Sequence, residues 1–173
     1  MLQAGIGTAL VLGGSAVALV RTRGYLLAPG RTLVGFTPWQ FVVVEHAARR
    51  IAAPDRPDDA SIPTADALDV AGFVDGWVAQ MPPHMRRDLG RFLGYVEHVA
   101  PVGAGFASRF TRLDAAAQDQ VLASIESSST DLLRAGFDGL RALVFLGYYR
   151  DARTWSIAGY DGPLVNRPLG GWK

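Results

Sequence analysis

The sequence predicts an all-α protein: a compact bundle of about five helices with an extra apolar amino-terminal helix and an extended carboxyl-terminal tail. Apolar residues recur with the 3.6-residue period of a helix in several segments, and no segment keeps the alternation of a strand for long. Prolines and capping residues separate these segments. The 173 residues, of which 49% are hydrophobic and 19% charged, suffice for one domain with a core and exclude a disordered chain.

Charge and cysteine content exclude several classes of function. Lys and Arg number 17 and Asp and Glu number 16, so the net charge of +1 is far from that of a general nucleic-acid binder. No cysteine is present, which excludes a disulfide framework, a thiolate zinc site and a cysteine-ligated iron–sulfur cluster within this chain.

Residues 1–23 are expected to lie outside the domain. The first 20 residues carry no charge, and at helical rise they reach about 30 Å, roughly the thickness of a bilayer core. Ala16 and Ala18 fit the small-residue rule for signal cleavage, and MLQAGIG is similar to the stretch that follows the paired arginines of a twin-arginine signal. An export signal, an intact membrane anchor and an ordinary buried helix remain alternatives. Residues 24–36 are interpreted as a linker.

The helical domain is expected over residues 37–150. Thr37, Pro38 and Gln40 form a capping box with proline in the first turn, which predicts a helix that runs to about Ala53. Pro54 ends it.

The second and third helices are predicted from a capping residue, a pair of prolines and the spacing of apolar residues. Thr64 is expected to cap the second, whose apolar residues follow offsets of 0, 3, 4, 7, 8 and 11 between Val70 and Met81. Pro82 and Pro83 break this helix and open the third, which keeps the same period.

Two further helices complete the predicted bundle. Asp114 is expected to cap the fourth, and Thr130 or Ser129 to begin the fifth. The fifth helix is apolar on more than one side, which predicts that it is central in the bundle or lies under a partner. Residues 151–173 form a tail rich in Gly, Pro and aromatic residues, which must dock on something to be ordered.

Two acid–histidine neighbours are the candidates for chemistry in the bundle. Glu45–His46 and Glu97–His98 would offer a metal or acid–base pair if antiparallel helices brought them together. Adjacent residues on a helix point apart, and Glu45 lies four residues before Arg49, so structural roles are favoured. The sequence contains no nucleophile elbow and no phosphate-binding loop. We therefore predict no catalytic, cofactor-binding or metal-binding residue.

A basic patch lies on the third predicted helix. It consists of Arg86, Arg87 and Arg91. It is interpreted as a solvated helix face or, alternatively, as a surface for an acidic partner.

The end of the domain carries the most specific motif. FLGYYRDARTW, residues 145–155, is followed by IAGYDGP, residues 157–163. This stretch resembles the closing signature of the gluconate 2-dehydrogenase subunit 3 family. Residues 47–57, 69–75 and 110–122 are also similar to that family, and the resemblance covers about residues 37–165.

The resemblance implies a non-catalytic helical small subunit, like that of bacterial FAD-dependent glucose dehydrogenase. Such a subunit pairs with a large GMC-type flavoprotein, supports its maturation and its twin-arginine export, and is accompanied by a cytochrome c subunit. The resemblance therefore implies no cofactor in this chain, FAD in the partner, and a location in the periplasm or at the periplasmic face of the inner membrane. The absence of cysteine leaves only noncovalent packing as the link.

Two other functions stay open at this point. One is a stand-alone, membrane-anchored helical protein that binds a lipid or small apolar ligand, which predicts an enclosed apolar cavity. The other is an enzyme that uses Glu45, His46, Glu97 or His98, which predicts clustered polar side chains in a pocket. A subunit predicts instead an exposed apolar strip.

The partner interface is predicted on the last helix and the tail, because aromatic and Arg side chains dominate interface energetics. Gly159 and Gly162 allow tight turns and Pro163 fixes the exit. The alternative is that Trp155 and Tyr160 fold back to cap the core of the bundle. The predicted interface residues are Phe145, Tyr148, Tyr149, Arg150, Asp151, Trp155, Gly159, Tyr160, Gly162 and Pro163.

Overall fold

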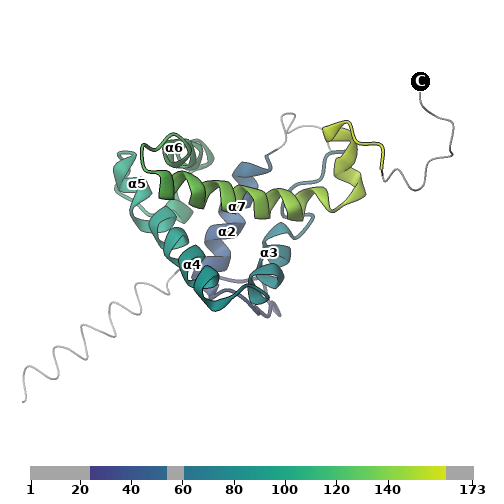
Figure 1. Ribbon diagram of the computed structural model, residues 1–173, viewed down its shortest axis with the longest axis horizontal. Coiled ribbons are helices and arrows are strands. Elements are labelled where there is room, and N and C mark those ends of the chain that lie inside the picture. The colour runs from purple at the N-terminus through teal and green to yellow at the C-terminus, as the bar shows by residue number, and fades with distance from the viewer. Residues whose placement is uncertain (1–23, 54–60, 163–173) are drawn as a thin grey trace, which may run out of the picture. The chain divides into compact units, whose positions relative to one another are not determined.

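The computed structural model describes residues 24–53 and 61–162 (Figure 1). In these residues every regular element is a helix, which confirms the predicted all-α class. The predictions for residues 1–23, for the loop at 54–60 and for Pro163 onward fall outside the described residues. No helix within the described part is long and apolar enough to cross a membrane. The chain divides into two units, residues 1–32 and 33–173, and the helices described below belong to the second.

Helix α2, Pro38–Ile51, is the innermost element of the second unit. Its capping box at Thr37 and Gln40 is present, as predicted, and it ends two residues earlier than expected. Val43, Val44 and Ala47 are fully buried because α3, α4, α6 and α7 all pack against α2. The consecutive apolar residues from Phe41 to Val44 point to different sides of the helix, so α2 is buried on more than one side.

Helix α3, Val70–Ala79, starts later than the sequence indicates. Thr64 accepts a hydrogen bond from the backbone N–H of Ala67 at 3.2 Å, but the turn that it caps does not continue as a helix. Asp69 has a left-handed backbone with φ of 46°, which interrupts the helical path. The prediction that Thr64 caps this helix is therefore wrong, because periodicity reports side-chain faces and not backbone breaks.

The remaining elements follow in chain order. Asp114 caps α6 by accepting a hydrogen bond from Ala117 N–H at 2.9 Å, as predicted. The tail, predicted to be extended, begins with a short 3-10 helix, η2. The bounds are α4 Pro83–His98, α5 Ala100–Gly103, η1 Phe110–Arg112, α6 Ala115–Glu126, α7 Asp131–Tyr149 and η2 Ala152–Ala158.

Helix α7 has two apolar faces, as predicted, and only one of them is covered. Figure 1 shows α7 crossing in front of α2, and it also packs against α3 and α6. The covered face places Phe137, Leu140, Val144 and Tyr148 in the core. The other face leaves Leu132, Phe145, Leu146 and Tyr149 exposed.

Asp75 of α3 binds the segment that leads into α2, residues 34–36. Its carboxylate is 4% exposed and accepts hydrogen bonds from the backbone N–H groups of Val34, Gly35 and Phe36 at 2.7–3.0 Å. A Cβ on Gly35 would lie 2.3 Å from the backbone oxygen of Asp75, so only glycine permits this approach. These contacts fix the segment that leads into α2.

Candidate functional site: two exposed apolar surfaces

The two acid–histidine pairs are used in different contacts in the structure. Glu97 is fully buried near the end of α4, where it accepts hydrogen bonds from Thr111 N–H at 3.1 Å and Thr111 Oγ1 at 2.8 Å. Arg109 Nε lies 3.6 Å from Glu97 Oε1, an ion pair at longer range. Glu97 thus binds the η1 turn to α4, which is a structural role.

His46 and its neighbours serve other contacts. His46 Nδ1 lies 2.9 Å from Nε2 of Gln118 on α6. Burial and the nearby Arg49 lower the pKa of His46, while Glu97 and Asp66 act in the opposite direction. Glu45 pairs with Arg49 at 3.3 Å, as its spacing predicts. The described residues contain no group of three or more metal-ligating side chains.

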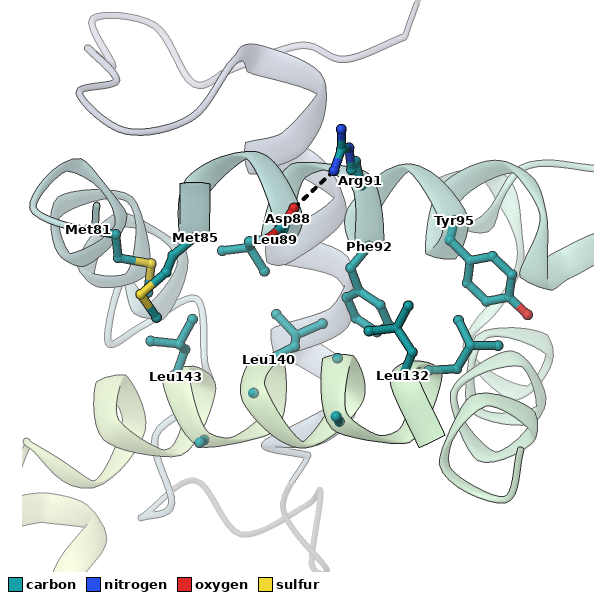
Figure 2. A pocket seen from close by; sticks show the side chains of 15 residues that line it. Met81, Met85, Asp88, Leu89, Arg91, Phe92, Tyr95, Leu132, Leu140 and Leu143 are labelled. Atoms are coloured by element: carbon teal, nitrogen blue, oxygen red, sulfur yellow. Dashed lines mark hydrogen bonds and ion pairs between the residues drawn. The ribbon is translucent and has the colours of Figure 1, made fainter. Parts of the chain in front are cut away.

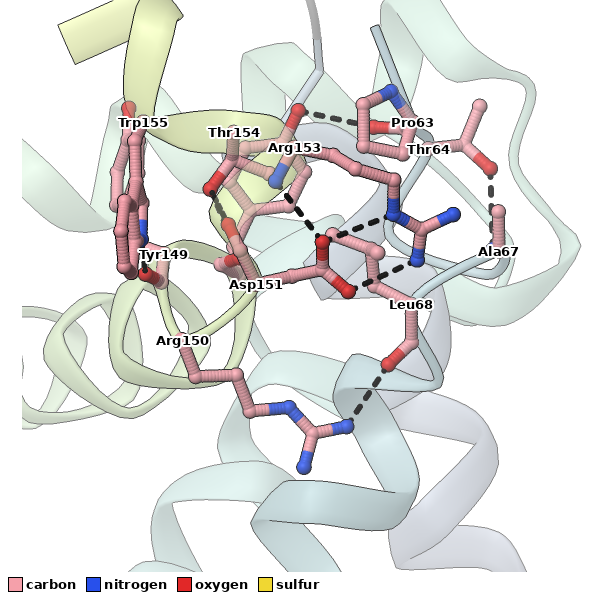
Figure 3. A network of polar contacts seen from close by, with 11 residues as sticks. Pro63, Thr64, Ala67, Leu68, Tyr149, Arg150, Asp151, Arg153, Thr154 and Trp155 are labelled. Carbon is pink, nitrogen blue, oxygen red and sulfur yellow. Dashed lines mark hydrogen bonds and ion pairs between the residues drawn. The ribbon is translucent and has the colours of Figure 1, made fainter. Parts of the chain in front are cut away.

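The predicted interface around α7 and η2 is partly used within the chain itself. Tyr148 is buried, and its hydroxyl donates a hydrogen bond to Pro63 O at 2.9 Å. Arg150 donates to Leu68 O at 3.0 Å, and its guanidinium lies 4.8 Å from the Phe73 ring centroid. Figure 3 shows Arg150 reaching toward Leu68 from the end of α7. These two residues hold the end of α7 to the segment before α3 and to α3 itself.

The turn from α7 into η2 is stabilised by Asp151 and Arg153. Asp151 accepts hydrogen bonds from Arg153 N–H, Nε and Nη2 at 2.8–3.0 Å (Figure 3). Hydrogen bonds from the Arg153 side chain and backbone lower the pKa of Asp151 to about 2. Both groups are solvent-facing, so they orient the turn more than they stabilise the fold.

Trp155 and Tyr160, which follow α7, fold back on its end. Trp155 Nε1 donates to Tyr149 O at 2.9 Å, and the Trp155 and Tyr160 rings meet edge to face with centroids 5.2 Å apart. Gly162 has φ of 102°, and a Cβ there would lie 3.4 Å from the Trp155 ring. The requirement for glycine at position 162 therefore has a physical reason. Gly159, also left-handed at φ of 65°, ends η2.

This docking leaves an exposed apolar surface at the carboxyl-terminal end of the described chain. Trp155 is half-buried, whereas Tyr160 remains 45% exposed. We name this the carboxyl-terminal surface. Its exposed members are Phe145, Leu146, Tyr149, Ile157 and Tyr160.

A second apolar surface lies between α4 and α7. Figure 2 shows side chains of the two helices facing each other across a groove, with Met81 and Met85 at one end and Tyr95 and Leu132 at the other. The groove has a volume of about 660 Å³ and an almost wholly apolar lining. We name it the α4–α7 groove. Its lining residues are Met81, Met85, Asp88, Leu89, Arg91, Phe92, Tyr95, Leu132, Leu133, Ala135, Gly136, Gly139, Leu140, Ala142 and Leu143.

The groove was not predictable from the period of α4. Met85, Leu89 and Phe92 repeat at helical spacing, which is typical of a core stripe, yet Met85 is 48% exposed. The signal in the sequence was on α7, where Gly136 makes room for the Phe92 ring and Gly139 leaves open space. A Cβ at Gly136 would lie 2.4 Å from the Phe92 ring, whereas a Cβ at Gly139 would meet nothing within 4 Å.

One comparison with known proteins agrees with this architecture. The model of the family described as gluconate 2-dehydrogenase subunit 3 matches residues 38–162, from the first residue of α2 to the turn at Gly162. That description names a subunit of a multi-subunit dehydrogenase. No curated protein and no solved structure matches the chain. Because the match spans well over half of its length, the chain belongs to the gluconate 2-dehydrogenase subunit 3 family.

Proposed function

We propose that the chain is an accessory, non-catalytic small subunit of a periplasmic FAD-dependent sugar or alcohol dehydrogenase. In this role it supports the maturation, stability and twin-arginine export of a large GMC-type flavoprotein, with a cytochrome c subunit as the further partner. The FAD belongs to the flavoprotein, and the chain itself binds no cofactor. Residues 1–23 act as the export signal, and the rest of the complex is held at the periplasmic side of the inner membrane.

The observation that carries this proposal is the carboxyl-terminal surface. Aromatic and aliphatic side chains that would normally be buried are exposed on a fixed support. Trp155 holds η2 to α7, and Arg150 holds the end of α7 to Leu68 and to Phe73 of α3. Aromatic side chains fixed in this way bind a protein partner at a low cost in conformational entropy. The family match supports the same role.

Co-purification tests the proposal directly. The tagged full chain, expressed together with a candidate GMC-type flavoprotein, should retain a yellow protein with the absorbance of bound FAD. Truncation after Arg153 and the separate change Trp155→Ala should each reduce that yield and the amount of flavoprotein in the periplasm. Retention and export at wild-type levels in both variants would show that the carboxyl-terminal surface is not the interface.

Export is tested separately by removal of residues 1–23. The flavoprotein should then bind the shortened subunit in the cytoplasm and stay there, with its FAD in place. Flavoprotein in the periplasm at unchanged levels would contradict the proposed export role.

A further inference from the structure

From the α4–α7 groove we infer a second docking site, which receives an amphipathic helix of the partner subunit, with an apolar face in the groove and acidic residues beside Arg87 and Arg91. The inference rests on the proposed function, since it assigns the helix to the partner. It concerns a surface other than the carboxyl-terminal surface.

The dimensions of the groove fit a helix. From Met85 to Tyr95 the groove follows α4 for about 15 Å, because an α-helix rises about 1.5 Å per residue. A bound helix of that length would have about three turns. Leu132 is 79% exposed and Met85 is 48% exposed, so the groove is open at both ends and is no closed cavity for a small ligand. A helix presents its anchors at every third or fourth residue, which suits an open apolar channel.

The floor of the groove allows an occupant to approach closely. Gly139 would tolerate a Cβ without meeting any atom within 4 Å, so the space above the α7 backbone there is empty. Ala135 and Ala142, one turn on either side, also line the groove. Met81 and Met85 at one end are flexible enough to adjust to the shape of an apolar partner.

Charge distinguishes the two edges of the groove. Arg91 lines it on the α4 side, and Arg87 lies one turn earlier on the same side of the helix. Arg91 pairs with Asp88 at 3.1 Å, but both side chains are more than 60% exposed, and Arg87 has no ion-pair partner within the described residues. This edge therefore carries a net positive charge, while the lining residues of α7 carry none. The charge pattern selects an occupant that is acidic on the α4 side.

The same features disfavour a second copy of this chain. The groove is concave, so it cannot fill an identical groove, and a two-fold contact along α4 would bring Arg87 and Arg91 toward their own copies. An amphipathic helix with an acidic flank can fill the concave groove and can also place negative charge beside the two arginines.

Designed peptides test the site without knowledge of the partner. The probe is a fluorescent peptide of about 14 residues, with Leu at positions i, i+3, i+4 and i+7 and Glu along one flank. Two controls carry Lys on that flank or a scrambled order. Fluorescence anisotropy with the purified full chain should give tighter binding for the Glu peptide than for the Lys peptide, and none for the scrambled one.

Two variants locate the binding. Gly139→Leu should fill the groove and weaken the Glu peptide about tenfold or more, whereas Gly76→Leu on α3, where a Cβ also meets nothing within 4 Å, should leave binding unchanged. The double change Arg87→Glu and Arg91→Glu should reverse the preference between the Glu and Lys peptides, by about fivefold in each direction. Circular dichroism should show all three variants to be folded.

Several outcomes would overturn the inference. It fails if no peptide binds, or if Gly139→Leu binds the Glu peptide as the wild type does. A wild-type dimer that Gly139→Leu converts to a monomer would assign the groove to a second copy. A lipid that co-purifies with the wild type and is lost from Gly139→Leu would assign it to a small apolar ligand.

The co-purification experiment separates this inference from the proposed function. Flavoprotein capture that is equal for the wild type and Gly139→Leu would leave the proposed function intact and remove the partner helix from the groove. Absence of flavoprotein with the wild-type chain would remove the proposed function, whatever the peptides do.

Discussion

Helix α4 borders two regions of opposite character. At its carboxyl end Glu97, a carboxylate, is fully buried, whereas on another face Met85, a large apolar side chain, is 48% exposed. The buried carboxylate is satisfied within the chain, by Thr111 and Arg109. The apolar groove has no cover among the described residues. Polarity alone therefore does not decide whether a side chain is buried. A charged group can be buried when it has hydrogen-bond and ion-pair partners, and an apolar face stays exposed when nothing covers it.

The energetic consequences of the two regions differ. Leaving a buried charge without its partner costs about 3–5 kcal/mol, so the surroundings of Glu97 contribute to the stability of the isolated chain. Covering a Leu that is exposed, such as Leu132, yields about 1.5–3 kcal/mol, which is available only to a complex. The first region is therefore expected to control folding, and the second association.

The largest effect is expected for Glu97→Ala. The change leaves the nearly buried Arg109 guanidinium and the Thr111 donors without this acceptor, so the free energy of unfolding should fall by about 3–5 kcal/mol. Urea denaturation followed by circular dichroism measures it. Glu126→Ala, which removes a surface ion pair with Arg141, is the control and should cost less than about 1 kcal/mol. Equal losses in the two variants would show that the buried carboxylate has no special role.

The next effect compares two glycines of α7 on the groove side. Gly136→Ala drives a Cβ against the Phe92 ring, so it should cost about 1–3 kcal/mol in stability. Gly139→Ala meets no atom and should gain about 0.5–1 kcal/mol, because alanine favours a helix over glycine. Thermal unfolding of both variants checks the opposite signs. A loss at both positions would mean that the groove is narrower than the structure indicates.

A third prediction uses the pH dependence of the polar interior. Because the pKa of folded His46 lies below its unfolded value of 6.5, the unfolded state binds more protons as the pH falls through that range. The contribution of neutral His46 is therefore full above pH 6.5 and declines below it. Unfolding measured from pH 5 to 8 should show a shallower decline in His46→Gln than in the wild type. Parallel curves for the two proteins would contradict the lowered pKa.

Sequence patterns predicted the elements that depend on local chemistry. The capping box at Thr37, the double proline before α4 and the Asp114 cap each act within one helical turn, and each appears at the predicted place. The start of α3 was mispredicted because the left-handed backbone at Asp69 depends on packing and not on its neighbours in sequence.

The surfaces were predictable only in part. The two apolar faces of α7 indicated that one face would stay uncovered. The aromatic residues that follow α7 placed the predicted interface at its carboxyl end. The α4–α7 groove arises from the separation of two helices, which no single helix encodes. Tyr148 and Arg150 look like interface residues in sequence, yet their partners, Pro63 and Leu68, lie over 80 residues away in the chain.

The smallest expected change in stability tests the carboxyl-terminal surface. Tyr160 is 45% exposed and contacts the Trp155 ring, so Tyr160→Ala should cost less than about 1 kcal/mol in the isolated chain. Because the same side chain is available to a partner, the variant should retain markedly less flavoprotein in co-purification. Tyr148→Phe is the matched control: it loses the hydrogen bond to Pro63 O, costs about 1 kcal/mol, and should keep full flavoprotein yield. If Tyr160→Ala destabilises the chain by more than Tyr148→Phe and flavoprotein capture is unchanged, the aromatic tail serves the core of this chain and not its partner.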